Sequence, residues 1–275
     1  MGINKETKIC VSIAASPGNF GSQFHNLGYQ LLGLNFVYLP LQVNEGQLKK
    51  ALDALKTFNI VGCSVSMPHK IKSLAYLDEL GSCAQKVGAV NTIKNDAGRL
   101  IGFNTDYTGA RKAIEETGAI KNKEVTLIGA GGVAKAIAWA VTDLGGRLSV
   151  FNRTPDRLKK WPKDIPARIK RWDELKKAQG HLLINATCVG MNDNEATAVP
   201  PSIIKNFSII QDVVLDPVNT LLIRRARALK KKIILGTDMC FTQAAAQFKI
   251  YTGVDAPLEK IKKLFNHTPL WRGGD

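Results

Sequence analysis

The chain has 275 residues, of which 45% are hydrophobic and 22% charged, an ordinary composition for a soluble protein that buries one large core or two modest ones. No apolar run is long enough to span a bilayer, and the polar N-terminus lacks a signal-peptide core, so we expect a cytoplasmic protein with no membrane partner. The net charge of +15 raises the question of a nucleic-acid partner.

The densest basic segment is expected to be a solvated helix face. Its cations lie on, and just after, a helix expected over residues 220–229: Arg224, Arg225, Arg227, Lys230, Lys231 and Lys232. No aromatic residue interleaves with them and no nucleic-acid-reading motif accompanies them, whereas cations near a helix C-terminus are favourable. We therefore expect no nucleic-acid partner, and the surplus charge would help to attract an anionic substrate and cofactor.

The cysteines and histidines indicate neither disulfides nor a metal site. Five cysteines are scattered along the chain, at Cys10, Cys63, Cys83, Cys188 and Cys240, and no two have metal-ligand spacing. The four histidines form no HExxH-like cluster. We expect reduced thiols and no metal.

Strand-like and helix-like patterns alternate along the chain. Up to residue 103, strands are expected over 8–14, 36–39, 60–65, 89–94 and 100–103, and helices over 20–32, 45–58 and 69–80, with a turn signal at 95–98. Beyond it, strands are expected over 124–128, 147–151, 181–185, 209–214 and 232–235, and helices over 107–117, 239–252 and 258–265. Such alternation predicts parallel sheets with helices on both faces.

Two α/β domains with a cleft between them are the expected architecture. The first would comprise residues 1–103 and 239–275, with the C-terminal helices packing back on it, and the second residues 104–238. Active sites often lie at such domain junctions.

The strand over 125–128 runs directly into Gly129, Ala130, Gly131, Gly132, Val133 and Ala134, which predicts a dinucleotide pyrophosphate site. Gly129 permits the tight turn, Gly131 lets the backbone approach a pyrophosphate, and Ala134 allows close helix–strand packing. The following helix offers free N–H groups and a positive dipole end. This context favours a doubly wound, Rossmann-type domain over a tight turn with no ligand.

The end of the next strand indicates which dinucleotide is bound. An NAD site normally has Asp or Glu there, whereas this chain has Asn152, Arg153 and Thr154, with Arg157 close behind. Arginine can pair with a 2′-phosphate, which a carboxylate would repel, so we expect NADP(H). The alternative is a capped helix start, with Thr154 as N-cap and Pro155 at the first helical position, and both can hold.

Three polar segments stand just beyond apolar strands, where ligands sit in parallel sheets. They are 64–70, 89–92 and 104–106, and they offer one amine, one carboxylate, two amides and several hydroxyls. That set suits a small polyhydroxylated molecule. Each could instead be a turn or a cap, as Asn104 or Thr105 would be for the following helix.

These motifs resemble those of the shikimate/quinate dehydrogenase family over nearly the whole chain. Ser64–Lys70 matches its Asn-Val-Thr-x-Pro-x-Lys motif, Val90-Asn91-Thr92 its Val-Asn-Thr, and Asn104-Thr105-Asp106 the start of its Asn-Thr-Asp-Gly. The glycine loop and Asn152-Arg153-Thr154 match its NADP motifs. Further matches are Asn185-Ala186-Thr187, Gly190-Met191, and Met239 to Phe248 with Gln243.

The resemblance implies roles for the matching residues. Lys70 would be the catalytic general acid/base, with Asp106 beside it, because the substrate oxygen must gain or lose a proton as hydride moves to or from the nicotinamide. The ring hydroxyls would bind Ser66, Asn91, Asp106 and Gln243. The cofactor would contact Gly236 and Met239 at its nicotinamide face, together with Ala186, Thr187 and Val213.

Departures from the family resemble its divergent dehydrogenase-like subgroup. The two serines expected to hold the substrate carboxylate are Asn19 and Gly21 here, so Ser12, Ser16 or Ser22 are the candidates to replace them. Tyr107 stands in place of glycine, Leu215 in place of tyrosine and Asp238 in place of glycine.

The leading hypothesis is an NADP(H)-dependent dehydrogenase, a monomer or homodimer, acting on shikimate, quinate or a similar cyclic hydroxy acid. One alternative keeps this chemistry on an amino- or deoxy-analogue, and another is a non-catalytic NADP(H)-binding sensor. A nucleic-acid-binding protein is a distant further alternative.

Overall fold

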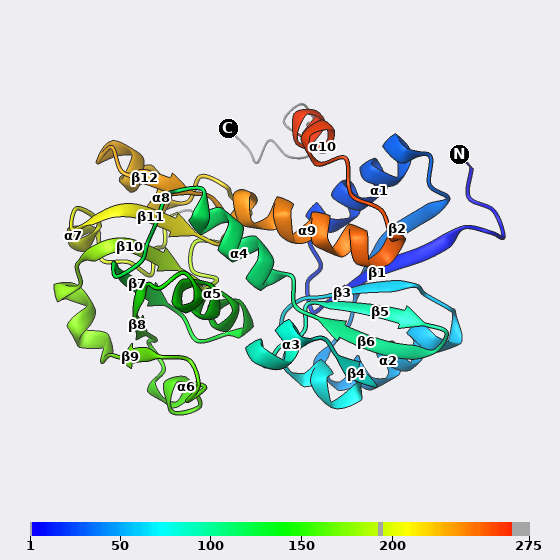
Figure 1. Cartoon of the computed structure of the whole chain (residues 1–275), viewed down its shortest axis with the longest axis horizontal. Coiled ribbons are helices and arrows are strands. Elements are labelled where there is room, and N and C mark those ends of the chain that lie inside the picture. The colour runs from blue at the N-terminus through cyan, green and yellow to red at the C-terminus, as the bar shows by residue number, and fades with distance from the viewer. Residues whose placement is uncertain (1, 192–194, 266–275) are drawn as a thin grey trace. The chain divides into compact units, whose positions relative to one another are not determined.

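The computed structural model describes residues 2–191 and 195–265, and the chain forms two compact units. Among these residues, the first unit holds 2–105 and 241–265, and the second holds 106–191 and 195–240. The chain returns from the second unit to the first inside a long helix, α9 (Gly236–Thr252) (Figure 1). The last part of the first domain expected from sequence, residues 266–275, lies outside the described residues.

The first unit is built on a mixed six-stranded sheet with the order β2-β1-β3-β5-β6-β4. Its strands are β1 (Lys8–Ala14), β2 (Phe36–Gln42), β3 (Gly62–Val65), β4 (Glu79–Leu80), β5 (Thr92–Asp96) and β6 (Arg99–Phe103). The expectation of a parallel sheet is wrong here, since β5 runs antiparallel to both β3 and β6. Only Ala97 and Gly98, both with positive φ, separate β5 from β6, and a two-residue turn can join only antiparallel strands.

The helix expected over 69–80 is also wrong. The chain forms a short 3₁₀ helix, Lys72–Tyr76, and then β4, which pairs with β6. The Ser73 hydroxyl bonds back to the His69 carbonyl, and Leu77 and Leu80 pack against Gly102 of β6. Tertiary packing therefore overrides the helical pattern of this segment.

The other helices of the first unit are α1 (Phe20–Leu32), α2 (Leu48–Thr57), α3 (Ser82–Val87), the C-terminal part of α9, and α10 (Leu258–Phe265). A 3₁₀ helix, Glu45–Gln47, replaces the start of the helix expected over 45–58. The C-terminal helices pack back on this unit, as expected, because a buried aromatic cluster joins Phe24, Tyr29 and Tyr38 to Phe241, Phe248 and Phe265.

The second unit is a doubly wound parallel sheet with the order β12-β11-β10-β7-β8-β9. Its strands are β7 (Glu124–Ile128), β8 (Arg147–Phe151), β9 (Ala167–Ile169), β10 (Gly180–Asn185), β11 (Phe207–Asp212) and β12 (Lys232–Ile234). Every paired strand is parallel. Counted with β7 as strand 1 and read from the β9 edge, the order is 3-2-1-4-5-6, which confirms the Rossmann-type prediction. The sequence missed β9, a three-residue edge strand that is mostly exposed.

Helices flank this sheet: α4 (Asp106–Glu115), α5 (Gly132–Asp143), α6 (Pro155–Lys159), α7 (Pro201–Ile204) and α8 (Leu221–Ala228). Small residues of α5, among them Ala134, Ala138 and Val141, are buried in a core with Leu127 and Val150 of the sheet. Helices α4 and α5 lie side by side (Figure 1). The close approach of α5 to the sheet is what Ala134 was expected to allow.

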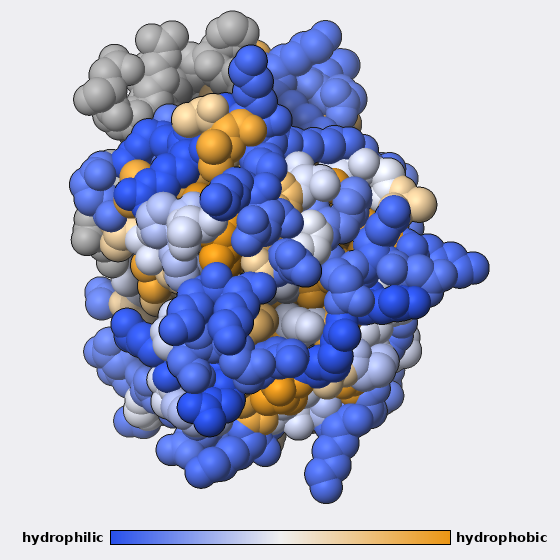
Figure 2. Space-filling model, turned by 90° about the vertical axis from the view of Figure 1, so that its left-hand side faces the viewer, coloured by the Kyte–Doolittle hydropathy of each residue, from blue (hydrophilic) through white to orange (hydrophobic). Residues whose placement is uncertain are grey.

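The face of the molecule shown in Figure 2 is largely hydrophilic, with hydrophobic residues in small separate patches between polar ones. In the basic segment after α8, the Lys231 and Lys232 amines donate to the carbonyls of Lys205 and Thr117. All five cysteines are free thiols. Within the described residues, no helix has the length and apolar character to cross a bilayer, and no His, Cys, Asp and Glu cluster could hold a metal ion.

Candidate functional site

Three polar segments of the first unit meet at one edge of its sheet. Strands β3 and β6 end at this edge, and β5, which is antiparallel to both, begins there. Asn91 therefore precedes a strand instead of following one, contrary to expectation, and yet it reaches the same edge as the other two segments. The register places Thr92 opposite both Ser64 and Phe103.

Asn91 and Thr105 are locked together by hydrogen bonds. The Asn91 Oδ1 accepts from the Thr105 backbone N–H at 2.8 Å and from the Thr92 hydroxyl at 2.8 Å. The Asn91 Nδ2 donates to the Thr105 Oγ1 at 2.9 Å. All three residues are buried, so this amide has one well-defined orientation.

Gln247 supports this network from α9, and the sequence did not single it out. Its Nε2 lies 3.0 Å from the Thr92 Oγ1, 3.1 Å from the Asn91 carbonyl oxygen and 3.2 Å from the Ser64 Oγ. The residue stands one helical turn after Gln243, which the sequence did name. Because residues four apart share a helix face, this spacing was a signal that could have identified it.

The turn that carries Ser66 and Lys70 is fixed by its backbone and by His69. The Ser66 N–H donates to the Ile13 carbonyl, and the Ala15 N–H donates to the Met67 carbonyl. The buried His69 ring bonds the Val43 carbonyl at 2.7 Å. The Lys70 carbonyl accepts from the Val90 N–H at 2.9 Å, which brings the backbone of Lys70 next to that of Asn91.

The N-terminal segment explains one of the departures from the family pattern. Asn19 is exposed, whereas Gly21 and Ser22 lie partly buried in the first turn of α1. A Cβ on Gly21 would lie only 3.1 Å from the Tyr38 hydroxyl, so the Tyr38 ring leaves little room for a side chain there. The Ser22 hydroxyl donates to the Asn19 carbonyl, which makes it part of the helix start.

The glycine loop of the second unit has the geometry expected of a pyrophosphate cradle. Gly129 has a φ of +121°, and a Cβ there would lie 2.8 Å from the Ala186 carbonyl oxygen, so only glycine fits. A Cβ on Gly131 would meet nothing within 4 Å, so open space lies against the backbone at that point. Gly131 is the N-cap of α5 and no side chain caps the helix, so Gly132 and the residues after it present N–H groups that suit an anion.

The residues after β8 suit a 2′-phosphate. Arg153 and Arg157 are exposed, and neither pairs with a carboxylate among the described residues. The nearby carboxylate of Asp156 pairs with Lys159 instead. Thr154 is the N-cap of α6 with Pro155 at its first turn, as the capping alternative supposed, but its side chain accepts no cap hydrogen bond. Instead the Asn152 Nδ2 donates to the Thr154 carbonyl at 2.8 Å and fixes the loop.

A buried carboxylate orders the loops after β10 and β11. The Asp212 carboxylate accepts from the Asn185 Nδ2 at 3.0 Å and from the Thr220 hydroxyl at 2.7 Å. Burial raises the pKa of Asp212 to about 6, because the charged form loses its hydration and these hydrogen bonds restore only part of the loss. The Asn185 Oδ1 in turn accepts from the Thr187 N–H and hydroxyl, which holds Thr187 and places Ala186 against Gly129.

The start of α9 packs closely on the loop after β11. A Cβ on Gly236 would lie 2.8 Å from the Val213 carbonyl oxygen, so glycine is required here as well. Met239 is buried in the second unit's core. Asp238 is exposed and its carboxylate accepts from the Leu235 N–H at 2.8 Å, so this departure from the family pattern serves the helix start.

Asp106 and Lys70 belong to different units. Asp106 is buried at the first turn of α4, directly after Thr105 in the chain. Its neighbour Tyr107 donates its hydroxyl to the Asp143 carboxylate of α5 at 2.7 Å and accepts from Arg111 at 3.3 Å. This departure thus ties the helix bearing Asp106 to the glycine-loop helix.

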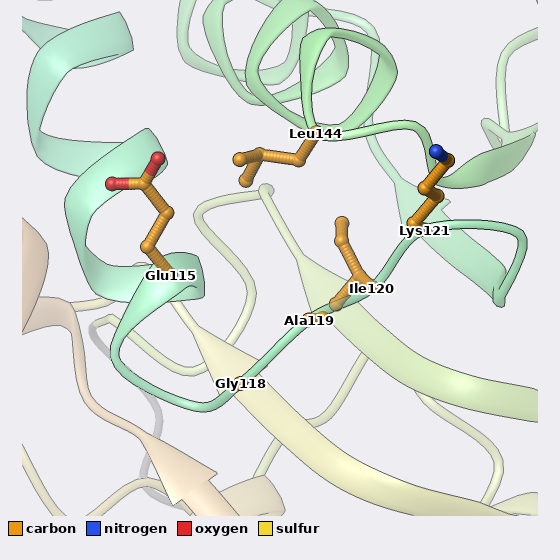
Figure 3. Close-up of a pocket in the computed structure, with 6 residues that line it drawn as sticks. All are labelled: Glu115, Gly118, Ala119, Ile120, Lys121 and Leu144. Atoms are coloured by element: carbon orange, nitrogen blue, oxygen red, sulfur yellow. The ribbon is translucent and has the colours of Figure 1, made fainter.

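A hollow of about 160 Å³ lies at the other end of α5 from the glycine loop. Leu144 and Ile120 face it, and Glu115 and Lys121 stand at its rim (Figure 3). The hollow lies next to the segment that precedes β7, at the amino end of that strand. The predicted nucleotide-binding residues follow the carboxyl ends of the strands, so the hollow is not part of the candidate site.

The chain is similar to proteins of one family over almost its whole length. A family model described as the shikimate dehydrogenase substrate binding domain matches residues 15–93. The shikimate dehydrogenase (NADP(+)) of Methanocaldococcus jannaschii is 35% identical, covering 94% of this chain and 96% of that protein. The shikimate dehydrogenase-like protein of Haemophilus influenzae is 37% identical, covering 91% and 92%.

A solved structure shares the fold. The shikimate 5-dehydrogenase of Thermus thermophilus, in complex with NADP(H) and shikimate, superposes with a TM-score of 0.84 at 28% identity, covering 94% of this chain and 98% of that one.

Proposed function

Because the chain belongs to the shikimate dehydrogenase family, we propose that it is an NADP(H)-dependent oxidoreductase that interconverts shikimate and 3-dehydroshikimate or a related cyclic hydroxy acid such as quinate. Several curated relatives carry the name shikimate dehydrogenase (NADP(+)). These names favour this activity over an amino- or deoxy-analogue as substrate and over a non-catalytic sensor.

The observation that carries the proposal is the convergence of the polar motifs in the first unit. The turn of Ser66 and Lys70 is hydrogen-bonded beside Asn91, and Asn91 is bonded to Thr105, the residue before Asp106. Three segments spread over residues 64–106 of the printed sequence thus bring the backbone of Lys70, the Asn91 amide and several hydroxyls to one sheet edge. A polyhydroxylated ring needs such a set of convergent polar groups.

In this proposal the residues of the first unit bind the substrate and move its proton. The Lys70 amine gives or takes the proton at the substrate oxygen, and Asp106 of the second unit, which directly follows Thr105 in the chain, is its proposed partner in proton transfer. Ser66, Asn91 and Gln243 hold ring hydroxyls, and Asn91 can do so with little loss of entropy because its amide is already oriented. Because Asn19 and Gly21 replace the serines expected for the carboxylate, Ser12, Ser16 and Ser22 are the candidates for that contact.

The residues of the second unit hold the dinucleotide. Bound NADP(H) supplies or accepts the hydride. Gly131, Gly132 and the start of α5 cradle the pyrophosphate, and Arg153 and Arg157 pair with the 2′-phosphate. The loops of Ala186, Thr187 and Val213, with Gly236 and Met239, line the rest of the cofactor site. The first unit is accordingly the substrate domain and the second the NADP domain, in a cytoplasmic monomer or homodimer.

The test is steady-state NADP⁺ reduction with shikimate and with quinate, for the wild-type protein and for Lys70→Ala. We expect turnover of at least one substrate, and a fall in kcat of about 10²- to 10⁴-fold in the variant, the usual size of a general acid/base contribution. The NADPH affinity, measured by fluorescence, should not change. A wild-type protein that binds NADPH but turns over no cyclic hydroxy acid would contradict the proposal and support the sensor.

A further inference from the structure

Gln247 is a buried polar side chain in an otherwise apolar part of α9. It is only 3% exposed, and the next residue, Phe248, lies in the aromatic cluster of the first unit. A buried amide costs free energy unless it is hydrogen-bonded, so its partners show what it does there.

The partners of Gln247 fix the direction of the hydrogen bonds beyond it. An amide nitrogen can only donate, so the oxygens of Ser64, Asn91 and Thr92 within 3.2 Å of the Nε2 must accept. The Thr92 hydroxyl therefore accepts from Gln247 and is left to donate its own proton to the Asn91 Oδ1, 2.8 Å away. A relay of two hydrogen bonds that donate in the same direction therefore runs from Gln247 of α9 to the Thr92 hydroxyl and from that hydroxyl to the Asn91 Oδ1.

The relay supplies one of the two donors that hold the Asn91 amide in its orientation. With its Oδ1 accepting from the Thr92 hydroxyl and from the Thr105 N–H, its Nδ2 must face the Thr105 Oγ1. Without the Gln247 donor, the Thr92 hydroxyl could turn its proton to another oxygen, such as the Thr105 Oγ1 at 3.3 Å. The Asn91 Oδ1 would then lose one of its two short hydrogen bonds and would be held at this end mainly by the Thr105 N–H.

We propose that Gln247 is a positioning residue of the substrate pocket, which acts through Thr92 to hold the Asn91 side chain and the Thr105 backbone in the orientation that binds substrate. The inference rests on the proposed function, since that function makes Asn91 a substrate ligand. Gln247 touches neither substrate nor cofactor in this account, and it belongs to the pocket's support.

The experiment compares Gln247→Met, which keeps the length and burial of the side chain but removes its donor, with Thr92→Val, which breaks the next link of the relay. Asn95→Ala is the matched control. Asn95 is also a buried amide on β5, but it bonds the Leu55 carbonyl and the Gly98 N–H at the far end of the strand. Two quantities are measured: kinetic constants for shikimate and NADP⁺, and hydrogen exchange of the Thr105 amide.

We expect kcat/KM for shikimate to fall about tenfold to a hundredfold in Gln247→Met and Thr92→Val, the size typical of a misplaced binding group. The double variant should lose little more than either single one, because both break the same relay. The Thr105 amide should exchange at least about tenfold faster, the scale of one lost hydrogen bond. NADPH affinity should stay within about twofold of wild type in all variants, and the Asn95→Ala control should keep both kcat/KM and Thr105 protection.

The proposal is overturned if Gln247→Met retains Thr105 protection, if NADPH affinity falls as much as shikimate kcat/KM, or if the control loses as much as the relay variants. If the wild type turns over no cyclic hydroxy acid, the proposed function has failed. Thr105 exchange then still decides whether Gln247 orients Asn91.

Discussion

The two units build their binding groups in different ways. In the first unit, side chains hold the site: Asn91 is bonded by Thr92 of β5, by Thr105 in the segment after β6, and by Gln247 of α9. In the second unit, the cradle is mostly backbone, made of a left-handed Gly129, an open Gly131 and an uncapped helix start. A side-chain network is damaged by losing any member, whereas a backbone cradle is damaged mainly by adding atoms.

The largest effect should come from adding one carbon at Gly129. A Cβ there meets the Ala186 carbonyl and forces an alanine into a φ of +121°. Gly129→Ala should therefore lower the free energy of unfolding by about 4 kcal/mol, from backbone strain and overpacking together. Chemical denaturation measures this loss.

Gly131→Ala is the matched control, since its Cβ meets nothing within 4 Å. It should leave the unfolding free energy within about 0.5 kcal/mol of wild type while weakening NADPH binding at least about tenfold, because the added methyl group stands where the pyrophosphate would approach. Equal destabilisation by the two variants would contradict the distinction between a packed glycine and an open one.

Asp212 is a residue of the second unit whose side chain, unlike the backbone cradle, forms a hydrogen-bonded network, with Asn185 and Thr220. Its folded pKa of about 6 lies above its ordinary value of 3.8. The protonated form is thus favoured by folding, and the contribution of this group to stability is complete below about pH 4 and is lost as the pH rises through about 6. That loss is about 3 kcal/mol, from about two pKa units.

The measurement is the unfolding free energy of wild type and Asp212→Asn between pH 4 and pH 7. The difference between the two proteins should move in favour of the variant as the pH rises, because only the wild type acquires a buried charge. Parallel pH profiles would show that Asp212 titrates normally.

Arg153 should contribute to binding without contributing to folding, whereas the buried Asn91 should contribute to both. The side chain is exposed and has no carboxylate partner among the described residues. Arg153→Ala should leave the melting temperature unchanged and weaken NADPH binding by about 2 kcal/mol, roughly thirtyfold, with little effect on NADH, which lacks the 2′-phosphate. Titration of both cofactors checks this, and equal losses for NADPH and NADH would refute the 2′-phosphate assignment.

The smallest effect is expected at Tyr107. Removing its hydroxyl in Tyr107→Phe breaks its bonds with Asp143 and Arg111 at a partly exposed site. The unfolding free energy should fall by about 0.5–1 kcal/mol. A larger fall in kcat than in stability would mean that the tether between α4 and α5 also matters for Asp106.

Local sequence patterns predicted most of the second unit. Strands β7, β8, β10, β11 and β12, the glycine loop and the arginine after β8 all depend on neighbours within a few residues, where periodicity and backbone freedom decide the conformation. The exception is β9, whose sequence Ala-Arg-Ile is mostly exposed and offers no apolar run, whereas the equally short β12 includes the apolar pair Ile233 and Ile234.

The sequence was less informative about the first unit. The antiparallel direction of β5, the pairing of β4 with β6 and the loss of the helix over 69–80 depend on contacts distant in the chain. The motifs at Lys70, Asn91 and Asp106 were visible as residues, but the bonds that orient them were not.

By itself, the sequence determined which chemical groups this protein carries, in what order, and the local turn that a dinucleotide requires. Only the tertiary structure decided that Asn91 stands just before an antiparallel strand, at the edge where β3 and β6 end, and that Gln247, more than 150 residues away in the printed sequence, supplies the donor behind it. The physical reason is that a hydrogen bond is set by distance and direction in space, and the chain separation of its partners leaves no local pattern to read.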